Sequence, residues 1–178
     1  MKIRVLFILL AAAVFPSCDA IKDLFRTDIE TEFEMTIPVV VTETAIATKS
    51  GSSVTSYSYN KSHTFSLSEN DDLDDYLDRI KEIDLQNLSV EIFGLQAGQE
   101  IESLTISASG VGTVVTLNNL TPSSGKLSPT VSQDKLNEVA ATLKDNNEVT
   151  VTVNGSSNYA PMSFNVNLAM DAIVEAGL

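Results

Sequence analysis

The sequence predicts a mainly β protein, folded as a two-sheet antiparallel β-sandwich of immunoglobulin-like or related type, with about seven strands and two short helices. Two long segments alternate apolar and polar residues, which is the pattern of a strand with one buried face. Five shorter segments are bounded by polar turn sequences such as "GSS", "SGVG" and "NGSSN". Because each such strand has one apolar face, two sheets must pack together to bury these faces.

The clearest alternation lies in the first and last predicted strands. In residues 29–41, apolar side chains such as Phe33 and Ile37 alternate with Glu and Thr. Pro38 has no backbone donor for the ladder, so this strand is predicted to lie at a sheet edge or to bulge there. In residues 162–172, Met, Phe, Val and Leu alternate with polar residues. The five further strands are predicted at residues 54–67, 86–94, 101–108, 111–118 and 148–154.

Two helices are predicted between the strands, at residues 70–82 and 132–145. Each carries apolar residues at positions i, i+3, i+4 and i+7, which places them on one helix face. Ser68 and Asp71 have the spacing of a capping box before the first helix, and Ser132 is an N-cap candidate for the second. Since a strand follows each helix, the two halves suggest an internal duplication, which the sequence leaves open against a chance similarity.

The amino terminus predicts export from the cytoplasm. Lys2 and Arg4 precede an uncharged apolar run at residues 5–15, which has the length of a signal-peptide core. This run is too short to span a bilayer, because a membrane helix needs roughly 20 apolar residues. A small residue, Ser17, and the only cysteine, Cys18, follow it directly.

The stretch "FPSC" at residues 15–18 resembles the lipobox of bacterial lipoproteins, whose cysteine receives a diacylglycerol before the peptidase cuts in front of it. The resemblance implies that residues 1–17 are a signal peptide removed by signal peptidase II. Cys18 would then be the lipidated first residue, carrying acyl chains such as palmitate, and residues 18–27 a short tether. Residues 28–178 are predicted to form a single β-sandwich domain. The alternative is an ordinary signal peptide that contains a thiol.

The charge of the chain limits its partners. Removal of the signal peptide takes away two cations and changes the formal charge from −13 to −15. A surface this acidic repels nucleic acid and anionic headgroups, so we expect no nucleic-acid ligand and membrane contact only through lipid on Cys18. The expected location is the bacterial cell envelope, as an outer-membrane lipoprotein. The sequence leaves open whether it faces the periplasm or the cell surface, and whether its partner is a protein or a glycan.

Residues that could carry out chemistry are scarce. If Cys18 is lipidated, no thiol remains for catalysis, a disulfide or a metal site. His63 is the only histidine and cannot build a multi-histidine zinc site, and no G-x-S-x-G motif is present. We therefore predict no catalytic residue, no metal and no cofactor, and expect a protein that is not an enzyme. A glycosidase-like pair of carboxylates is the last alternative.

One predicted strand carries a candidate recognition strip. Tyr57, Tyr59 and His63 lie at alternate positions of the strand at 54–67 and so share one face. Tyrosine provides an amphipathic contact surface at low entropic cost, which is typical of binding surfaces. The alternative is that both tyrosine rings pack against the core.

An aspartate-rich segment invites a calcium interpretation. The candidate ligands are Asp71, Asp72, Asp74 and Asp75. The glycine and the bidentate glutamate of an EF-hand loop are missing at the required spacing. We therefore expect these carboxylates in the first turns of a helix, where the helix dipole stabilises negative charge.

These features favour a lipid-anchored envelope protein with a binding or structural role. One alternative is a subunit of a surface fibre that exchanges a strand with its neighbour, which requires an unpaired groove beside Pro38. Another is a carrier of an apolar ligand, which requires a cavity of roughly 300–1,000 Å³ in the core.

Overall fold

A computed structural model describes residues 26–43, 46–48 and 55–177 of the chain. Residues 1–17, Cys18 and most of the predicted tether lie outside these ranges. The described residues form two antiparallel sheets, one α-helix and three short 3₁₀ turns, which confirms the predicted β-sandwich. Within these ranges, no helix is both long and apolar enough to cross a bilayer.

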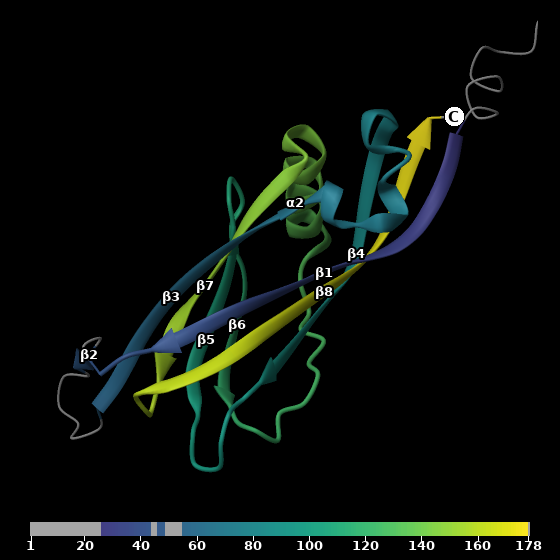
Figure 1. The fold of residues 1–178 in the computed structure, drawn as a ribbon. Helices are drawn as coiled ribbons and strands as arrows, with labels where there is room; N and C mark the ends of the chain where they lie inside the picture. Colours follow the sequence, from purple (N-terminus) through teal and green to yellow (C-terminus); the bar gives the residue numbers. More distant parts are fainter. Residues whose placement is uncertain (1–25, 44–45, 49–54, 178) are drawn as a thin grey trace, which may run out of the picture.

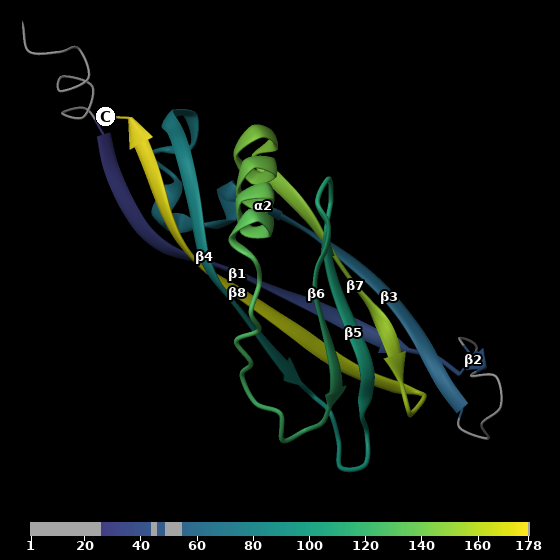
Figure 2. The same cartoon turned by 180° about the vertical axis from the view of Figure 1, so that it is seen from behind.

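The two sheets differ in size (Figures 1 and 2). The three-stranded sheet has the order β1-β8-β4, with bounds β1 Arg26–Val41, β8 Met162–Gly177 and β4 Ile80–Phe93. The other has the order β2-β3-β7-β5-β6, with bounds β2 Ile46–Thr48, β3 Thr55–Ser66, β7 Glu148–Ser157, β5 Ile101–Ala108 and β6 Gly112–Leu120. The seven long strands are those that the sequence predicts, and the short β2 is an addition.

The strand order is related to that of an immunoglobulin domain but differs from it. Lettered A to G in chain order, the seven long strands group as A, G and C in one sheet and B, F, D and E in the other. An immunoglobulin constant domain instead groups A, B, E and D against C, F and G. The protein is therefore a sandwich of a related kind.

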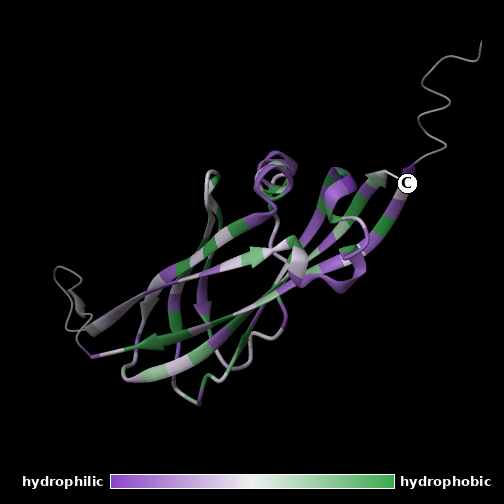
Figure 3. Cartoon of the chain, turned by 45° about the horizontal axis from the view of Figure 1, so that its top comes forward, coloured by the Kyte–Doolittle hydropathy of each residue, from purple (hydrophilic) through white to green (hydrophobic). Residues whose placement is uncertain are grey.

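Alternating burial defines the inner face of the three-stranded sheet. From Phe33 to Val41, odd-numbered residues of β1 are buried and even-numbered ones are exposed, an alternation visible as coloured bands along the strands in Figure 3. The backbone carbonyl of Glu32 points away from β8 and accepts a hydrogen bond from Asn70. Because even-numbered residues direct their backbone to this free edge, the missing N–H of Pro38 removes no ladder bond. The predicted edge position of this strand is confirmed.

Two different contacts close the sides of the sandwich. On one side β1 approaches β3, where the ring centroids of Phe33 and Phe65 lie 5.4 Å apart. On the other side α2 (Gln133–Asn146) lies against β4 and β7, with Ser132 as its N-cap. The predicted helix at 132–145 is thus confirmed. The helix buries its apolar stripe, Leu136, Val139, Ala140 and Leu143.

The predicted helix at 70–82 is wrong. The chain instead makes three 3₁₀ turns, Leu67–Glu69, Asp71–Leu73 and Leu77–Arg79, and β4 already begins at Ile80 rather than at 86. The backbone N–H groups of residues 70, 73, 76 and 79 each bind the carbonyl three residues earlier, which is the spacing of a 3₁₀ helix. The residues that the structure describes between β3 and β4 therefore include no counterpart to α2, which removes the main support for an internal duplication.

Side-chain hydrogen bonds explain why this segment does not form an α-helix. Asn70 caps the second turn, because its Oδ1 accepts from the backbone N–H of Asp72 at 3.1 Å. Its Nδ2 donates to the Glu32 carbonyl at 3.1 Å and to the Thr31 hydroxyl at 3.0 Å. These bonds hold the segment against the edge of β1 and offer its backbone an alternative to helical pairing. The capping box that forms joins Ser66 and Glu69 rather than the predicted pair.

We expect Asn70→Ala to lower the free energy of unfolding by about 1–2 kcal/mol, because it removes a turn cap and the hydrogen bonds to β1. Urea denaturation measures the change. Asn60→Ala is the matched control, since Asn60 is exposed on β3, and it should change stability by less than about 0.5 kcal/mol. Equal effects of the two substitutions would contradict this account of the segment.

Candidate functional site

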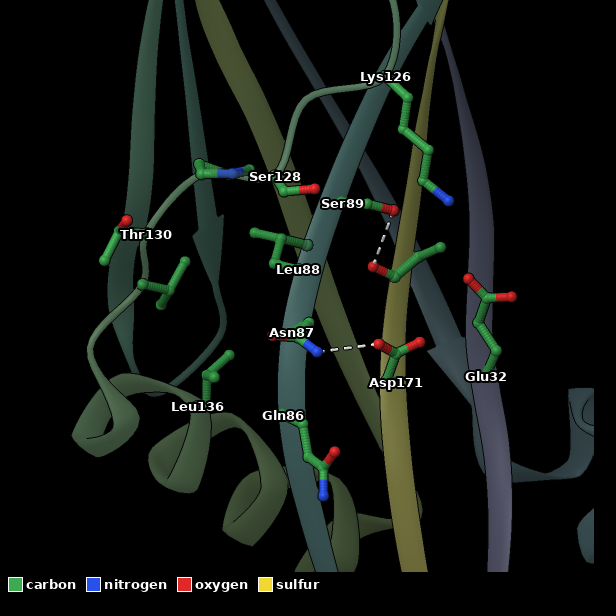
Figure 4. A pocket seen from close by; sticks show the side chains of 13 residues that line it. Glu32, Gln86, Asn87, Leu88, Ser89, Lys126, Ser128, Thr130, Leu136 and Asp171 are labelled. Atoms are coloured by element: carbon green, nitrogen blue, oxygen red, sulfur yellow. Dashed lines mark hydrogen bonds between the residues drawn. The ribbon is translucent and has the colours of Figure 1, made fainter.

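A pocket of about 420 Å³ lies at the free edge of β4 (Figure 4). Val90 and Leu127 exchange two backbone hydrogen bonds of 2.8 Å, which cover one part of the edge. Farther along, Gln133 Nε2 donates to the Leu85 carbonyl at 3.1 Å. Between these two contacts, residues 128–131 leave the edge open. We call this space the β4-edge pocket.

A bulge in β4 shapes the floor of the β4-edge pocket. The pairing of β4 with β8 shifts register between Leu85 and Asn87, so Gln86 is the extra residue. Asn87 Nδ2 then donates to Asp171 Oδ2 at 3.0 Å. On the other side of β8, Glu32 lies directly opposite Asp171. The two carboxylates are exposed cross-strand neighbours, and like charges in this position destabilise a sheet.

Lys126 supplies the positive charge of the pocket. Its side chain reaches from the loop before Leu127 across the outer face of β8 (Figure 4). Its ammonium group and the carboxylate of Glu32 point toward one another, yet no ion pair joins Lys126 to any described residue. The pocket is therefore lined by charges of both signs.

Tyr59 of the predicted recognition strip is buried. It is 6% exposed, and its ring packs edge-on against Phe164 with centroids 5.4 Å apart. Its hydroxyl donates to the Ser103 carbonyl at 2.7 Å by passing over Gly155 of the intervening strand. A Cβ at Gly155 would lie 1.9 Å from that carbonyl oxygen and 2.7 Å from the hydroxyl oxygen, so only glycine leaves room for the contact.

The other two strip residues remain partly accessible. Tyr57 is half-buried and packs against the core, and His63 is half-buried opposite Val151 of β7. The structure thus brings the strip onto one face of β3 but removes Tyr59 from solvent. A recognition role stays a prediction for Tyr57 and His63.

Asp71, Asp72, Asp74 and Asp75 are exposed. Asp71 and Asp72 lie in the first turn of the 3₁₀ helix Asp71–Leu73 and Asp74 caps its end, so the carboxylates are at a short 3₁₀ helix rather than at the longer helix that the sequence predicts. Asp72 accepts a hydrogen bond of 2.7 Å from the Thr31 hydroxyl. Asp71 and Asp72 also line an acidic groove beside β1, together with Glu32 and Glu34. Across the part of the chain that the structure describes, no group of three or more His, Cys, Asp or Glu residues is arranged to hold a metal.

The features that the two alternative functions require can be compared with the structure. Between the sheets lies a void of only about 20 Å³, lined by residues such as Met35, Ile106 and Leu168, far below the volume that a carrier needs. A strand added at the β1 edge would need free backbone N–H and C=O groups there. The Glu32 carbonyl already accepts a hydrogen bond from Asn70, and Pro38 has no backbone N–H to offer. Neither observation supports these alternatives.

No protein-family model matches the chain, and no curated protein is similar to it. The choice of the β4-edge pocket as the candidate site is therefore based on its geometry alone. Sequence reasoning missed its residues, because Glu32, Asn87, Lys126 and Asp171 come from four separate segments. The one feature of the sequence that could have indicated the pocket is the row of glutamates, Glu30, Glu32 and Glu34, on the polar face of β1.

We expect Tyr59→Phe to lower the free energy of unfolding by about 1–2 kcal/mol, since the part-buried hydrogen bond to the Ser103 carbonyl is lost. Tyr159→Phe is the control, because Tyr159 is 50% exposed. Thermal or urea denaturation of the two variants measures the difference. A smaller loss for Tyr59→Phe than for the control would show that the buried hydroxyl is not stabilising.

The same tyrosine predicts a pH dependence. Burial raises the pKa of the Tyr59 phenol above its ordinary value near 10, so the folded state holds this proton more tightly than the unfolded state. Its contribution is fully present below pH 10 and is lost as the pH rises above that value, with a slope of up to about 1.4 kcal/mol per pH unit. Unfolding measured from pH 9 to 11 should show this decline, and Tyr59→Phe should lack that part of it. Parallel profiles would contradict the assignment.

Proposed function

We propose that this protein is a lipoprotein of the bacterial outer membrane, anchored through Cys18, that works by binding a partner rather than by catalysis. The observation that carries the anchor is the resemblance of residues 15–18 to a lipobox after an apolar signal-peptide core. Two acyl chains or more hold a protein on a bilayer far longer than one chain does.

The position of the termini supports this proposal. Arg26 at the start of β1 pairs with Gly177 at the end of β8, so both strand ends lie at one end of the domain (Figure 1). Seven residues, 19–25, separate Arg26 from Cys18, and the eight residue steps between them span at most about 25–30 Å when the chain is extended. An anchored domain would keep this end near the membrane. The other end of β1, at Val41, would lie farther from the membrane, by at most the strand length of about 50 Å.

The exposure of the pocket carboxylates favours binding over catalysis. Glu32 and Asp171 are close enough to suggest a glycosidase pair, since they lie opposite one another on adjacent strands. The acid of a glycosidase, however, typically lies in an apolar pocket. Both carboxylates here are exposed at the rim of the pocket. They are suited to hold a positive charge of a ligand.

Metabolic labelling tests the anchor. Cells expressing the chain with an alkyne analogue of palmitate should label the wild type, whereas Cys18→Ser should lose both the label and the membrane fraction. Ser17→Ala is the matched control, because it keeps a small residue before the cysteine and should still be labelled. Label retained in Cys18→Ser, or a mature amino terminus beyond residue 18 without fatty acid, would overturn the anchor.

A further inference from the structure

We propose that β6 is a pairing surface for a second copy of this chain, with the two β6 strands antiparallel and centred on Leu117. The inference goes beyond the proposed binding role and does not depend on the lipid anchor. It uses three features of β6: its position at the edge of the five-stranded sheet, the open backbone groups along it and its lack of charge.

β6 differs from the other edge strands of the two sheets. β1 carries three glutamates and Pro38, β4 is covered at Leu85 and Val90, and β2 has only three residues. Charge, proline, covering segments and short length are the means by which proteins keep a strand edge from pairing. β6 has nine residues, GTVVTLNNL, with no charge and no proline. Its one irregularity is a bulge at Val114, near its start.

The backbone of Thr116 and Asn118 is open at this edge. Ser109, directly after β5, donates its backbone N–H to β7, so the odd-numbered residues of β5 direct their backbone groups to β7 and the even-numbered ones to β6. Leu104 is even-numbered and pairs with Leu117, so Leu117 bonds to β5. Thr116 and Asn118, on either side of Leu117, therefore direct their N–H and C=O groups outward. No described residue bonds to these groups.

Apolar side chains along the same edge are incompletely covered. Val115 and Leu117 face the core together with their partners on β5, Ile106 and Leu104. The β5 side chains are buried, whereas those of Val115 and Leu117 stay partly exposed, because no strand lies beyond β6. A further strand at this edge would cover them, and removal of apolar surface from water favours such a contact.

The charge of the chain favours a second copy as the occupant of this edge. Two copies of a chain with a formal charge of −13 repel one another, so they approach most readily where the surface carries no charge. A cationic partner would instead be attracted to the glutamates of β1. The outer face next to β6 is also uncharged and consists of Ser103, Thr105, Ser107, Thr150, Thr152, Asn154 and Ser156.

Antiparallel pairing centred on Leu117 uses all the open groups of Thr116 and Asn118. Thr116 of one copy lies opposite Asn118 of the other, and the reverse, which gives two pairs of backbone hydrogen bonds. The two copies of Leu117 form the non-hydrogen-bonded pair at the two-fold axis, with Cα atoms about 4.5 Å apart. Because both copies use the same surface, the contact is complete in a dimer.

This symmetry has a consequence for anchored copies. The two-fold axis stands perpendicular to the joined sheet and so reverses every direction in its plane. The two sheets of each domain pack face to face, so the ends that carry Arg26 would point in opposite directions (Figure 1). Such a pair suits copies on two facing surfaces better than neighbours on one bilayer, and in solution no anchor restricts it.

Cysteine cross-linking of the full mature chain in solution tests the pairing and its register. Cys18→Ser leaves no other thiol, so each introduced cysteine reports on one position. Leu117→Cys should give a disulfide-linked dimer under mild oxidation, because a Cα separation of about 4.5 Å is within the range of a disulfide. Val115→Cys is the matched control. It is also half-buried on the same face, but its two copies would lie about 14 Å apart and should stay monomeric.

A further variant tests the backbone hydrogen bonds. Thr116→Pro removes an N–H that bonds to nothing within the chain, so the domain should still fold, as urea denaturation would show. It should slow cross-linking through Leu117→Cys by about 5-fold or more, because each copy loses a donor. Equal cross-linking at positions 115 and 117, cross-linking at neither, or no effect of a folded Thr116→Pro would each overturn the proposal. The comparison of the two cysteines does not depend on the proline variant, and none of these results depends on labelling at Cys18.

Discussion

Sixteen consecutive residue pairs join β1 to β8, from Arg26 and Gly177 at one end to Val41 and Met162 at the other. Side chains alternate between faces along a strand, so a slip of one residue would turn the buried set toward water. The burial of one face therefore holds this register strongly. The same register sets Glu32 opposite Asp171 and brings the start of β1 and the end of β8 together at one end of the domain. Both the β4-edge pocket and the geometry proposed for the anchor depend on it.

The sequence predicted the elements whose signal is local. Alternating burial identified β1 and β8, and the stripe beginning at Leu136 identified α2, because one buried face imposes its period on neighbouring residues. The segment at 70–82 carries a similar stripe, yet its conformation depends on Asn70 bonding Thr31 and Glu32, which lie 39 and 38 residues away. A pattern of apolar residues within one segment cannot reveal hydrogen bonds to residues so far away in the sequence.

The pocket shows the same limit for function. Glu32, Asn87, Lys126 and Asp171 each resemble an ordinary solvated side chain in the sequence, and only the pairing of distant strands brings them together. The recognition strip shows the reverse case. Its alternation was visible in the sequence, but burial of Tyr59 depends on a glycine in β7 and a carbonyl in β5. Sequence patterns identified which face a side chain occupies, and packing decided whether it is accessible.

Negative charge lies close to the end of the domain that the proposed anchor would hold near the membrane. Carboxylates such as Asp28, Glu30 and Glu175 lie near the end that the tether would hold, and the whole chain has a formal charge of −13. Repulsion from anionic headgroups decays over a Debye length of about 8–10 Å at physiological salt, which is shorter than the reach of the tether. An anchored domain can therefore stand away from the bilayer and leave the outer face of its three-stranded sheet open to solvent.

The long-range field and the local geometry would act differently on ligands. The negative field concentrates any cation near the protein, whatever its shape, and salt screens this effect. A ligand held in the β4-edge pocket would depend in addition on the shape of the pocket and on the positions of Lys126, Glu32 and Asp171, which line it.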